Sequence, residues 1–181
     1  MSQIALPLPA GSTGPSRIVV GAANAHVAEA LAAPEAWPFR TAVLTGPPRS
    51  GKSLLARWFV ESGKGEAIDD AQSLDETALF HRWNRAQEAG TALLIVGGEP
   101  PWDIALPDLR SRLGAALQLE IGLPDDAMAG DLLLALAEQR GLPLGAAAID
   151  RLSLERKAPA TQTIWRAALE AVHGPEEPRL L

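Results

Sequence analysis

A strand-like run that leads into glycine, lysine and serine at fixed spacing has the chemistry of a phosphate site. Residues 42–53 contain Gly46-x-x-x-x-Gly51-Lys52-Ser53. The glycines let the backbone curl so that N–H groups point at a phosphate, Lys52 adds positive charge, and the Ser53 hydroxyl is placed to bind Mg²⁺. An ordinary Gly/Pro turn would not need all eight motif positions in register. We therefore expect phosphate-binding residues at Gly46, Pro47, Pro48, Arg49, Ser50, Gly51, Lys52, Ser53 and Leu54.

Two carboxylates follow the next short strand, at Glu66-Ala-Ile68-Asp69-Asp70. Downstream of a phosphate loop, such acids organise Mg²⁺ and water. An isolated Asp-Asp pair is usually a solvated turn, but its position after the loop favours the functional interpretation. We predict Ser53 and Asp69 as the magnesium ligands, and Asp70 as a catalytic residue that orients or polarises an attacking water.

Two arginines occur at Leu109-Arg110-Ser-Arg112-Leu113, just before an apolar stretch. They could be ordinary surface charge. Alternatively, one could be presented to the γ-phosphate of a nucleotide on a neighbouring molecule, where a guanidinium neutralises developing charge. Of the two, Arg112 is the stronger candidate for this catalytic role.

The pattern of apolar residues predicts an α/β fold with a parallel sheet flanked by helices. Ligands of such sheets bind at the carboxyl ends of the strands. A capping box at Ser73–Glu76 is expected to open a helix that ends at Gly90. From Pro124 the pattern becomes helical. The expected strands are 42–45, 66–68 and 91–96, residues 117–121 form a further apolar stretch, and the expected helices of the C-terminal part are 125–140, 144–152 and 159–173.

Composition limits the partners and the compartment. The net charge of −6 argues against direct binding to a nucleic-acid backbone, which needs clustered Lys and Arg. The chain has no cysteine, which fits a reducing cytosol. It also has no apolar run long enough to span a bilayer. We therefore expect a cytoplasmic protein with no membrane association. No helix-turn-helix segment follows the helical part, so we expect no direct sequence-specific DNA binding.

The N-terminal residues 1–17 are rich in Pro, Gly and Ser, so we expect them to be extended and largely unstructured alone. They contain Gln3-Ile-Ala-Leu6-Pro-Leu8. This could be a frayed terminus or a short linear motif, in which Leu6 and Leu8 enter an apolar groove and Gln3 anchors the peptide. The pattern resembles Gln-x-x-Leu-x-Leu, by which bacterial proteins dock on the replicative sliding clamp.

The order of these motifs resembles the AAA+ domain of the bacterial replication initiator DnaA over about residues 18–173. The resemblance, and its Hda-family members in particular, implies a P-loop AAA+ subdomain at 18–123, a three-helix lid at 124–173 and a tail at 174–181. It further implies bound ADP or ATP with Mg²⁺, adenine contact near Val20, and two partners, the sliding clamp and DnaA. By this resemblance the regulator promotes hydrolysis of DnaA-bound ATP, with Arg112 acting in trans. The segments that carry the resemblance are 18–24, 46–53, 68–72, 80–84, 100–101 and 109–113.

The chain also departs from that family. Gly97-Gly98 stands where a polar first sensor is usual, and Thr163 where the lid presents a sensor arginine, with Arg166 one turn later as a substitute. We therefore expect weak intrinsic hydrolysis at most. The alternative is a self-contained P-loop NTPase or phosphotransferase that works without a clamp partner. The sequence leaves the bound nucleotide and any homo-oligomer open.

Overall fold

The computed structural model describes residues 5–7 and 17–139. The chain divides into two compact units. Ala23–Leu123 forms one unit, and Met1–Ala22 together with Pro124–Leu181 forms the other. We describe each unit separately.

The Ala23–Leu123 unit is built on a four-stranded sheet with the strand order β4-β5-β3-β6. All three pairings are parallel, and β3 is hydrogen-bonded on both sides, with Val43 opposite both Ile95 and Gln118. A strand in this position has both faces covered, so it needs a continuous apolar run rather than alternation. The strands are β3 (Thr41–Thr45), β4 (Glu66–Ile68), β5 (Leu93–Val96) and β6 (Leu117–Glu120).

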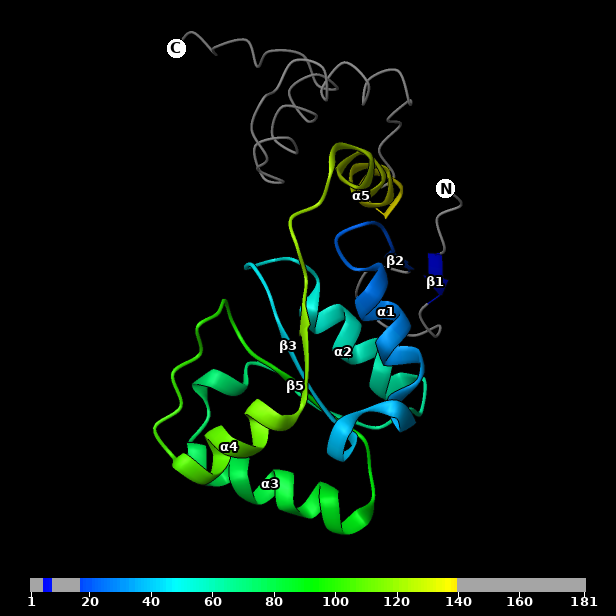
Figure 1. Cartoon of the computed structure of the whole chain (residues 1–181). Coiled ribbons are helices and arrows are strands. Elements are labelled where there is room, and N and C mark those ends of the chain that lie inside the picture. The colour runs from blue at the N-terminus through cyan, green and yellow to red at the C-terminus, as the bar shows by residue number, and fades with distance from the viewer. Residues whose placement is uncertain (1–4, 8–16, 140–181) are drawn as a thin grey trace, which may run out of the picture. The chain divides into compact units, whose positions relative to one another are not determined.

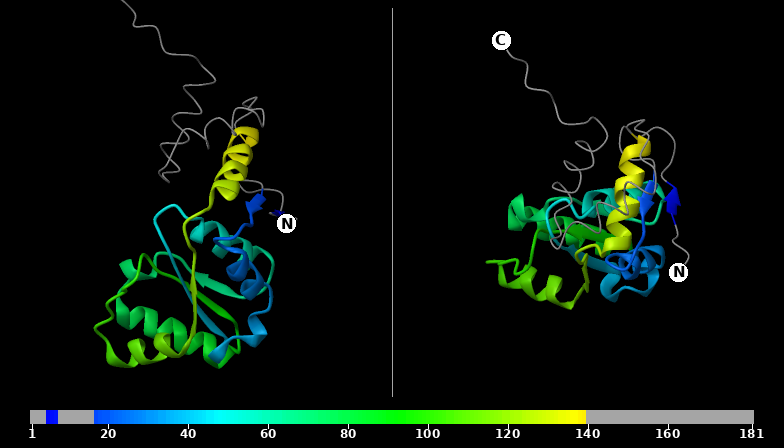
Figure 2. Two further views of the ribbon diagram at one scale, coloured as in Figure 1. Left: turned by 45° about the horizontal axis from the view of Figure 1, so that its top comes forward. Right: turned by 90° about the horizontal axis from the view of Figure 1, so that it is seen from above.

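Helices cover both faces of this sheet, as expected for parallel strands joined by crossover helices (Figures 1 and 2). One face carries α1 (Ala25–Ala32) and α2 (Lys52–Glu61). The other carries α3 (Glu76–Ala89) and α4 (Pro107–Ala115). The predicted α/β class with a parallel sheet flanked by helices is confirmed.

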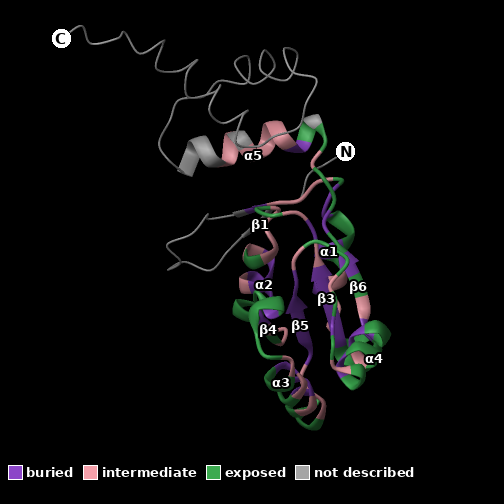
Figure 3. Ribbon diagram, turned by 90° about the vertical axis from the view of Figure 1, so that its left-hand side faces the viewer, coloured by how far each residue is buried: buried purple, intermediate pink, exposed green. Residues whose placement is uncertain are grey.

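The core of this unit lies on the two central strands, and Figure 3 shows the buried residues concentrated along β3 and β5. The strands alternate between the two faces, so that every second residue meets α3 and α4. A buried cluster on that face joins the sheet to both helices. Its members are Val43, Ile68, Ala71, Leu79, Trp83, Ala86, Leu93, Ile95, Ile104, Leu109, Leu113 and Ala116.

The start of α3 differs from the predicted capping box at Ser73–Glu76. Ser73 ends a 3₁₀ turn, Ala71–Ser73, and its hydroxyl donates to the Asp70 carbonyl. Asp75 caps the helix instead, since its carboxylate accepts from the Ala78 N–H at 2.9 Å. The capping-box prediction was wrong because the acid needed to complete it, Glu76, is engaged elsewhere.

Glu76 holds the segment that precedes α4. Its carboxylate oxygens accept from the N–H groups of Ala105 (2.9 Å) and Leu106 (2.6 Å). From the other side, the Arg110 guanidinium donates through two nitrogens to the Ile104 carbonyl. Hydrogen bonds to charged groups are stronger than those between neutral groups. These contacts therefore attach an irregular stretch to both α3 and α4.

The second unit contains a small hairpin and one described helix. Strand β1 (Ala5–Pro7) pairs antiparallel with β2 (Arg17–Val19), so that part of the N-terminal segment forms a strand rather than remaining unpaired. Pairing satisfies main-chain groups that an isolated extended segment leaves to water. Helix α5 (Asp126–Gln139) is the first of the three predicted lid helices, and the expected helices 144–152 and 159–173 lie outside the described residues.

In the described part of the chain, no helix combines the length and the apolar character needed to cross a bilayer.

Removal of the Glu76 carboxylate should destabilise the Ala23–Leu123 unit. We expect Glu76→Ala to lower the free energy of unfolding by about 2 kcal/mol, because two N–H groups lose a charged acceptor. Glu88→Ala is the matched control on the same helix, where the side chain is exposed, and should change stability by about 0.5 kcal/mol or less. Urea unfolding followed by circular dichroism measures both, and equal effects would contradict this role.

Candidate functional site

The predicted phosphate loop leaves the end of β3 and turns into α2. Gly46 has φ 146° and Gly51, which precedes the helix, has φ 93°, so both adopt conformations that favour glycine. A Cβ on Gly46 would lie 2.8 Å from the Ile121 carbonyl oxygen, whereas a Cβ on Gly51 would meet nothing within 4 Å. Gly46 is therefore required by the close approach of the chain after β6, whereas at Gly51 a side chain would have room and only the positive φ favours glycine.

Lys52 folds back over the loop. Its ammonium group donates to the carbonyl oxygens of Gly46 (2.7 Å) and Pro47 (2.8 Å). Burial lowers the pKa of Lys52 below its usual value, and the carboxylates of Glu99 and Asp69 oppose that shift by raising the pKa. The charge of Lys52 is thus partly desolvated and lies within the field of two acids.

The loop fits a phosphate on two independent grounds. The first intrahelical hydrogen bond of α2 runs from the Leu55 N–H to the Gly51 carbonyl (3.0 Å), so the N–H groups of the first turn have no intrahelical acceptor. The Ser50 hydroxyl oxygen is buried and has no hydrogen-bond partner among the described residues. Buried polar atoms without partners are uncommon, and an anionic oxygen in the loop would satisfy both kinds of group.

The two predicted acids occupy a tight turn after β4. Asp70 has φ 50°, a left-handed conformation that aspartate tolerates better than most residues, and its N–H donates to the Asp69 carboxylate at 3.0 Å. Both side chains are exposed, as is Ser53 on the first turn of α2. Because Asp69 perturbs the pKa of Lys52, its carboxylate acts on the phosphate loop across the intervening strand β5.

The donor set suits Mg²⁺ better than a metal held in a full protein cage. Among residues 5–7 and 17–139, no three His, Cys, Asp or Glu side chains converge as metal ligands. Mg²⁺ commonly keeps several waters and binds one or two carboxylates together with phosphate oxygens. Ser53 and Asp69 would hold it in that manner, and the ion would supply charge neutralisation at the phosphates.

Gln72 is a polar residue at the site that sequence analysis did not identify. The sequence leaves Gly97-Gly98 without a side chain at the end of β5. In the structure the Gln72 side-chain amide occupies that space. A Cβ added to Gly98 would collide with the amide oxygen and nitrogen of Gln72. The 3₁₀ turn after Asp70 brings Gln72 there, and no residue spacing indicates this contact. An amide at this position is able to hold a water.

The Arg112 guanidinium packs against α3. Its central carbon lies 4.6 Å from the Phe80 ring centre and 4.3 Å from that of Trp83, and one nitrogen donates to the Asn84 side-chain oxygen at 2.6 Å. Cation–π contact and a hydrogen bond restrict the group to one orientation. Arg110 lies on the same helix and is bonded to the Ile104 carbonyl. The structure thus joins the 80–84 and 109–113 segments, which the sequence showed only as separate motifs.

Other expected site residues lie elsewhere. Leu6 is in β1, opposite Ile18, while Gln3, Leu8, Thr163 and Arg166 lie outside the described residues. Val20 belongs to the second unit, so its contact with an adenine stays a prediction.

The comparisons with known proteins agree with this geometry. No protein-family model matches the chain. Among solved structures, domain III of the replication initiation protein DnaA from Thermotoga maritima matches with a TM-score of 0.66 at 16% identity, over 88% of this chain and 89% of that one. AMPPCP-bound DnaA from Aquifex aeolicus matches with a TM-score of 0.64 at 15% identity, over 90% of this chain and 65% of that one. The ADP-bound FIGL-1 AAA domain matches with a TM-score of 0.55 at 17% identity, over 86% of this chain and 71% of that one.

The parallel sheet with helices on both faces and a glycine-rich loop after β3 is a P-loop α/β fold. Its arrangement is similar to that of domain III of DnaA and of the FIGL-1 AAA domain. The chain spans about two thirds of the Aquifex aeolicus chain, 65% of its length.

The phosphate loop generates a direct test with magnesium ADP. We expect Lys52→Ala to weaken ADP binding about a hundredfold, because a charge-assisted contact to the phosphates is lost. Lys64→Ala is the matched control: this lysine lies beyond the far end of α2 and donates to the Ala32 carbonyl at 2.9 Å. Isothermal titration calorimetry measures both variants. ADP affinity equal to that of the unchanged chain in Lys52→Ala would exclude this loop as the site.

Proposed function

We propose that the chain is a nucleotide-binding AAA+ regulator of replication initiation that acts on DnaA. The observation that carries the proposal is the loop at 46–53, whose buried Ser50 hydroxyl has no hydrogen-bond partner among the described residues, in a fold like that of DnaA domain III. The DnaA and FIGL-1 structures of this fold are bound to AMPPCP and ADP respectively, which supports an adenine nucleotide here. Identification of the nucleotide released by denaturing the purified chain is the first experiment.

Nucleotide binding would organise the loop and its acids without requiring rapid turnover. Lys52 would exchange its carbonyl partners for phosphate oxygens, and Ser53 with Asp69 would hold Mg²⁺. Asp70 would orient a water. The Gln72 amide would replace the polar side chain that Gly97-Gly98 lacks. In this proposal ADP or ATP serves mainly to set the conformation of the regulator.

The proposal includes docking on the sliding clamp through Gln3, Leu6 and Leu8. Leu6 pairs with β2 through main-chain atoms in a hairpin of only three residue pairs. Two-stranded hairpins of this size have little stability of their own, so the peptide could leave β2 to enter a groove on the clamp.

The proposal also assigns Arg112 to the nucleotide bound by DnaA. Its guanidinium is held in one orientation by Phe80, Trp83 and Asn84, which lowers the entropy lost when it meets a phosphate. A trans-acting arginine stabilises charge that develops on the transferred phosphoryl group. The chain would in this manner promote hydrolysis of DnaA-bound ATP.

A self-contained NTPase is the second candidate. It is favoured by the Gln72 amide beside Gly98, because that contact restores a polar group at the end of β5. Multiple turnovers of ATP by the isolated chain would support it. Turnover that appears only with DnaA and the clamp would support the regulator.

Clamp docking should depend on the N-terminal peptide. We expect Gln3→Ala/Leu6→Ala to lose retention on immobilised sliding clamp, because the anchor amide and one apolar side chain are removed. Ile4→Ala, at a position that the pattern leaves free, is the matched control and should be retained. A pull-down of the full chain measures this. Equal retention of all three proteins would refute the clamp interaction and leave the nucleotide site untouched.

Arg112→Ala should abolish stimulated hydrolysis of DnaA-bound ATP, measured in a reconstituted assay with clamp loaded on DNA. Arg112→Lys should also fail in large part, because an ammonium lacks the planar fork that matches a phosphate. Arg85→Ala is the control, an exposed arginine on α3.

Because Arg112 also packs on α3, stability is measured in parallel, and a loss of about 1–2 kcal/mol is expected for Arg112→Ala. Hydrolysis unchanged in a folded Arg112→Ala protein would overturn the trans role.

A further inference from the structure

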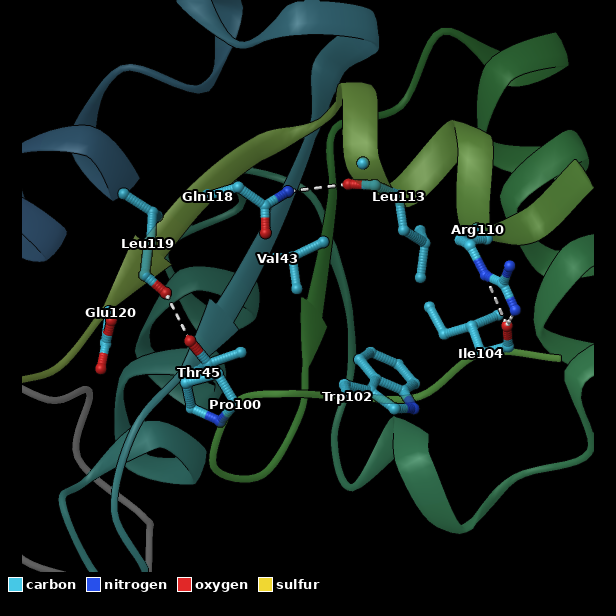
Figure 4. Close-up of a pocket in the computed structure, with 11 residues that line it drawn as sticks. Val43, Thr45, Pro100, Trp102, Ile104, Arg110, Leu113, Gln118, Leu119 and Glu120 are labelled. Carbon is cyan, nitrogen blue, oxygen red and sulfur yellow. Dashed lines mark hydrogen bonds between the residues drawn. The ribbon is translucent and has the colours of Figure 1, made fainter. Parts of the chain in front are cut away.

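A pocket of about 410 Å³ lies on the sheet face that carries α3 and α4, beside the edge strand β6. Figure 4 shows its lining, none of which belongs to the phosphate loop or the acidic turn. This volume falls within the range of sites that hold a small ligand or a large side chain. Apolar residues of the lining come from β3, β6, α4 and the loop before α4: Val43, Leu119, Leu113, Pro100, Trp102 and Ile104.

The loop side of the pocket is held in place. The Trp102 ring packs over Gly97, where an added Cβ would lie 3.1 Å from the ring. The Ile104 carbonyl is bonded to Arg110, and the two residues after it are bonded to Glu76. A site whose walls are already ordered spends little entropy on binding. The half-buried Trp102 ring therefore presents a fixed aromatic surface.

The polar groups that β3 and β6 contribute to the pocket present mainly acceptor atoms. The Gln118 side-chain nitrogen donates to the carbonyls of Leu113 (2.7 Å) and Ala116 (3.0 Å). These bonds leave the side-chain oxygen of Gln118 able to accept from a ligand. The Thr45 hydroxyl donates to the Leu119 carbonyl at 3.3 Å, so the lone pairs of the hydroxyl oxygen can still accept from a ligand. These two residues line the pocket together with Glu120. Their remaining hydrogen-bonding capacity favours a ligand that donates.

Glu120 supplies a negative charge that nothing in the described part of the chain neutralises by an ion pair. Its main-chain carbonyl is bonded to His26, but its exposed carboxylate has no partner there. The positive group of the lining, Arg110, is attached to the Ile104 carbonyl and lies on the opposite side of the pocket from Glu120, with Val43 and Trp102 between them (Figure 4). The end of the pocket near β6 is therefore acidic.

We propose that this pocket binds an arginine side chain of a protein partner. The aliphatic stem would lie along Val43 and Leu113, the guanidinium would stack on Trp102, and its N–H groups would donate to Glu120 and Gln118. Guanidinium groups favour tryptophan faces and paired carboxylate oxygens, so one side chain uses both features of the pocket. The net charge of −6 favours approach of a basic segment.

A polypeptide fits this place better than a free metabolite. Strand β6 is at the edge of the sheet and pairs only with β3 among the described strands. Apart from the Glu120 carbonyl, which is bonded to His26, its outer main-chain groups are left for an extended segment to pair with. The pocket is also open to solvent through the exposed Pro100, Gln118 and Glu120. An arginine presented on such a segment would gain main-chain contacts in addition to those of its side chain.

The test uses ¹⁵N-labelled full chain and two probes, acetyl-Gly-Arg-Gly-amide and its citrulline counterpart, which keeps the shape and lacks the charge. Trp102→Phe identifies the Trp102 indole N–H signal among those of the five tryptophans. We expect the arginine peptide to shift this signal saturably and to bind about fivefold more tightly than the citrulline peptide. Glu120→Gln should remove that difference and leave citrulline binding unchanged.

Asp108→Asn is the matched control, since this exposed carboxylate is on α4 and does not line the pocket. It should preserve the preference for arginine, which would separate the pocket from general attraction to an acidic chain. Equal affinity of the two peptides, a shift absent from Trp102, or tighter binding of acetyl-Gly-Glu-Gly-amide would overturn the proposal. None of these readouts depends on nucleotide or DnaA.

Discussion

The burial of β3 between two parallel neighbours is the constraint on which the rest of the Ala23–Leu123 unit depends. Hydrogen bonds join the ends of the three strands: Gly97 N–H to Leu44, Gly46 N–H to Gly98, and Ile121 N–H to Thr45. The residues that follow β3 therefore lie in contact with the segments that follow β5 and β6. There is no room for a side chain at Gly46. The loop that begins there leads to the start of α2, which lies at the carboxyl edge of the sheet.

The electrostatics of the candidate site follow from that crowding. Lys52 is partly desolvated because the loop folds around its side chain, and the loop carbonyls and the carboxylates of Asp69 and Glu99 compensate. Those acids belong to segments after β4 and β5. The parallel arrangement therefore gathers at one edge the residues that a phosphate site needs, although they are far apart in the chain.

The opposite side of the unit depends on contacts that charged side chains make between α3, α4 and the loop before α4. Glu76 binds main-chain N–H groups of that loop, Arg110 binds one of its carbonyls, and Arg112 binds Asn84 and two aromatic rings. Each contact pairs a charged group with a partner that limits its motion. The contacts of Glu76 and Arg110 hold the segment Ile104–Leu106, and with it part of the loop that lines the pocket beside β6.

The fold class and the loop at 46–53 could be predicted from the sequence, because hydrophobic periodicity, glycine spacing and helix boundaries are local properties that short segments specify. The sequence also predicted the end of α3 at Gly90 and a helix after Pro124. The start of α3 could not be predicted in this way, because the Glu76 carboxylate accepts from N–H groups about thirty residues away instead of completing a local capping box. Only the tertiary structure placed Gln72 against Gly98, Arg112 against α3, and Glu120 in a pocket with Trp102. Such contacts depend on how strands and helices pack, and residue spacing along the chain carries no information about which distant side chains will meet.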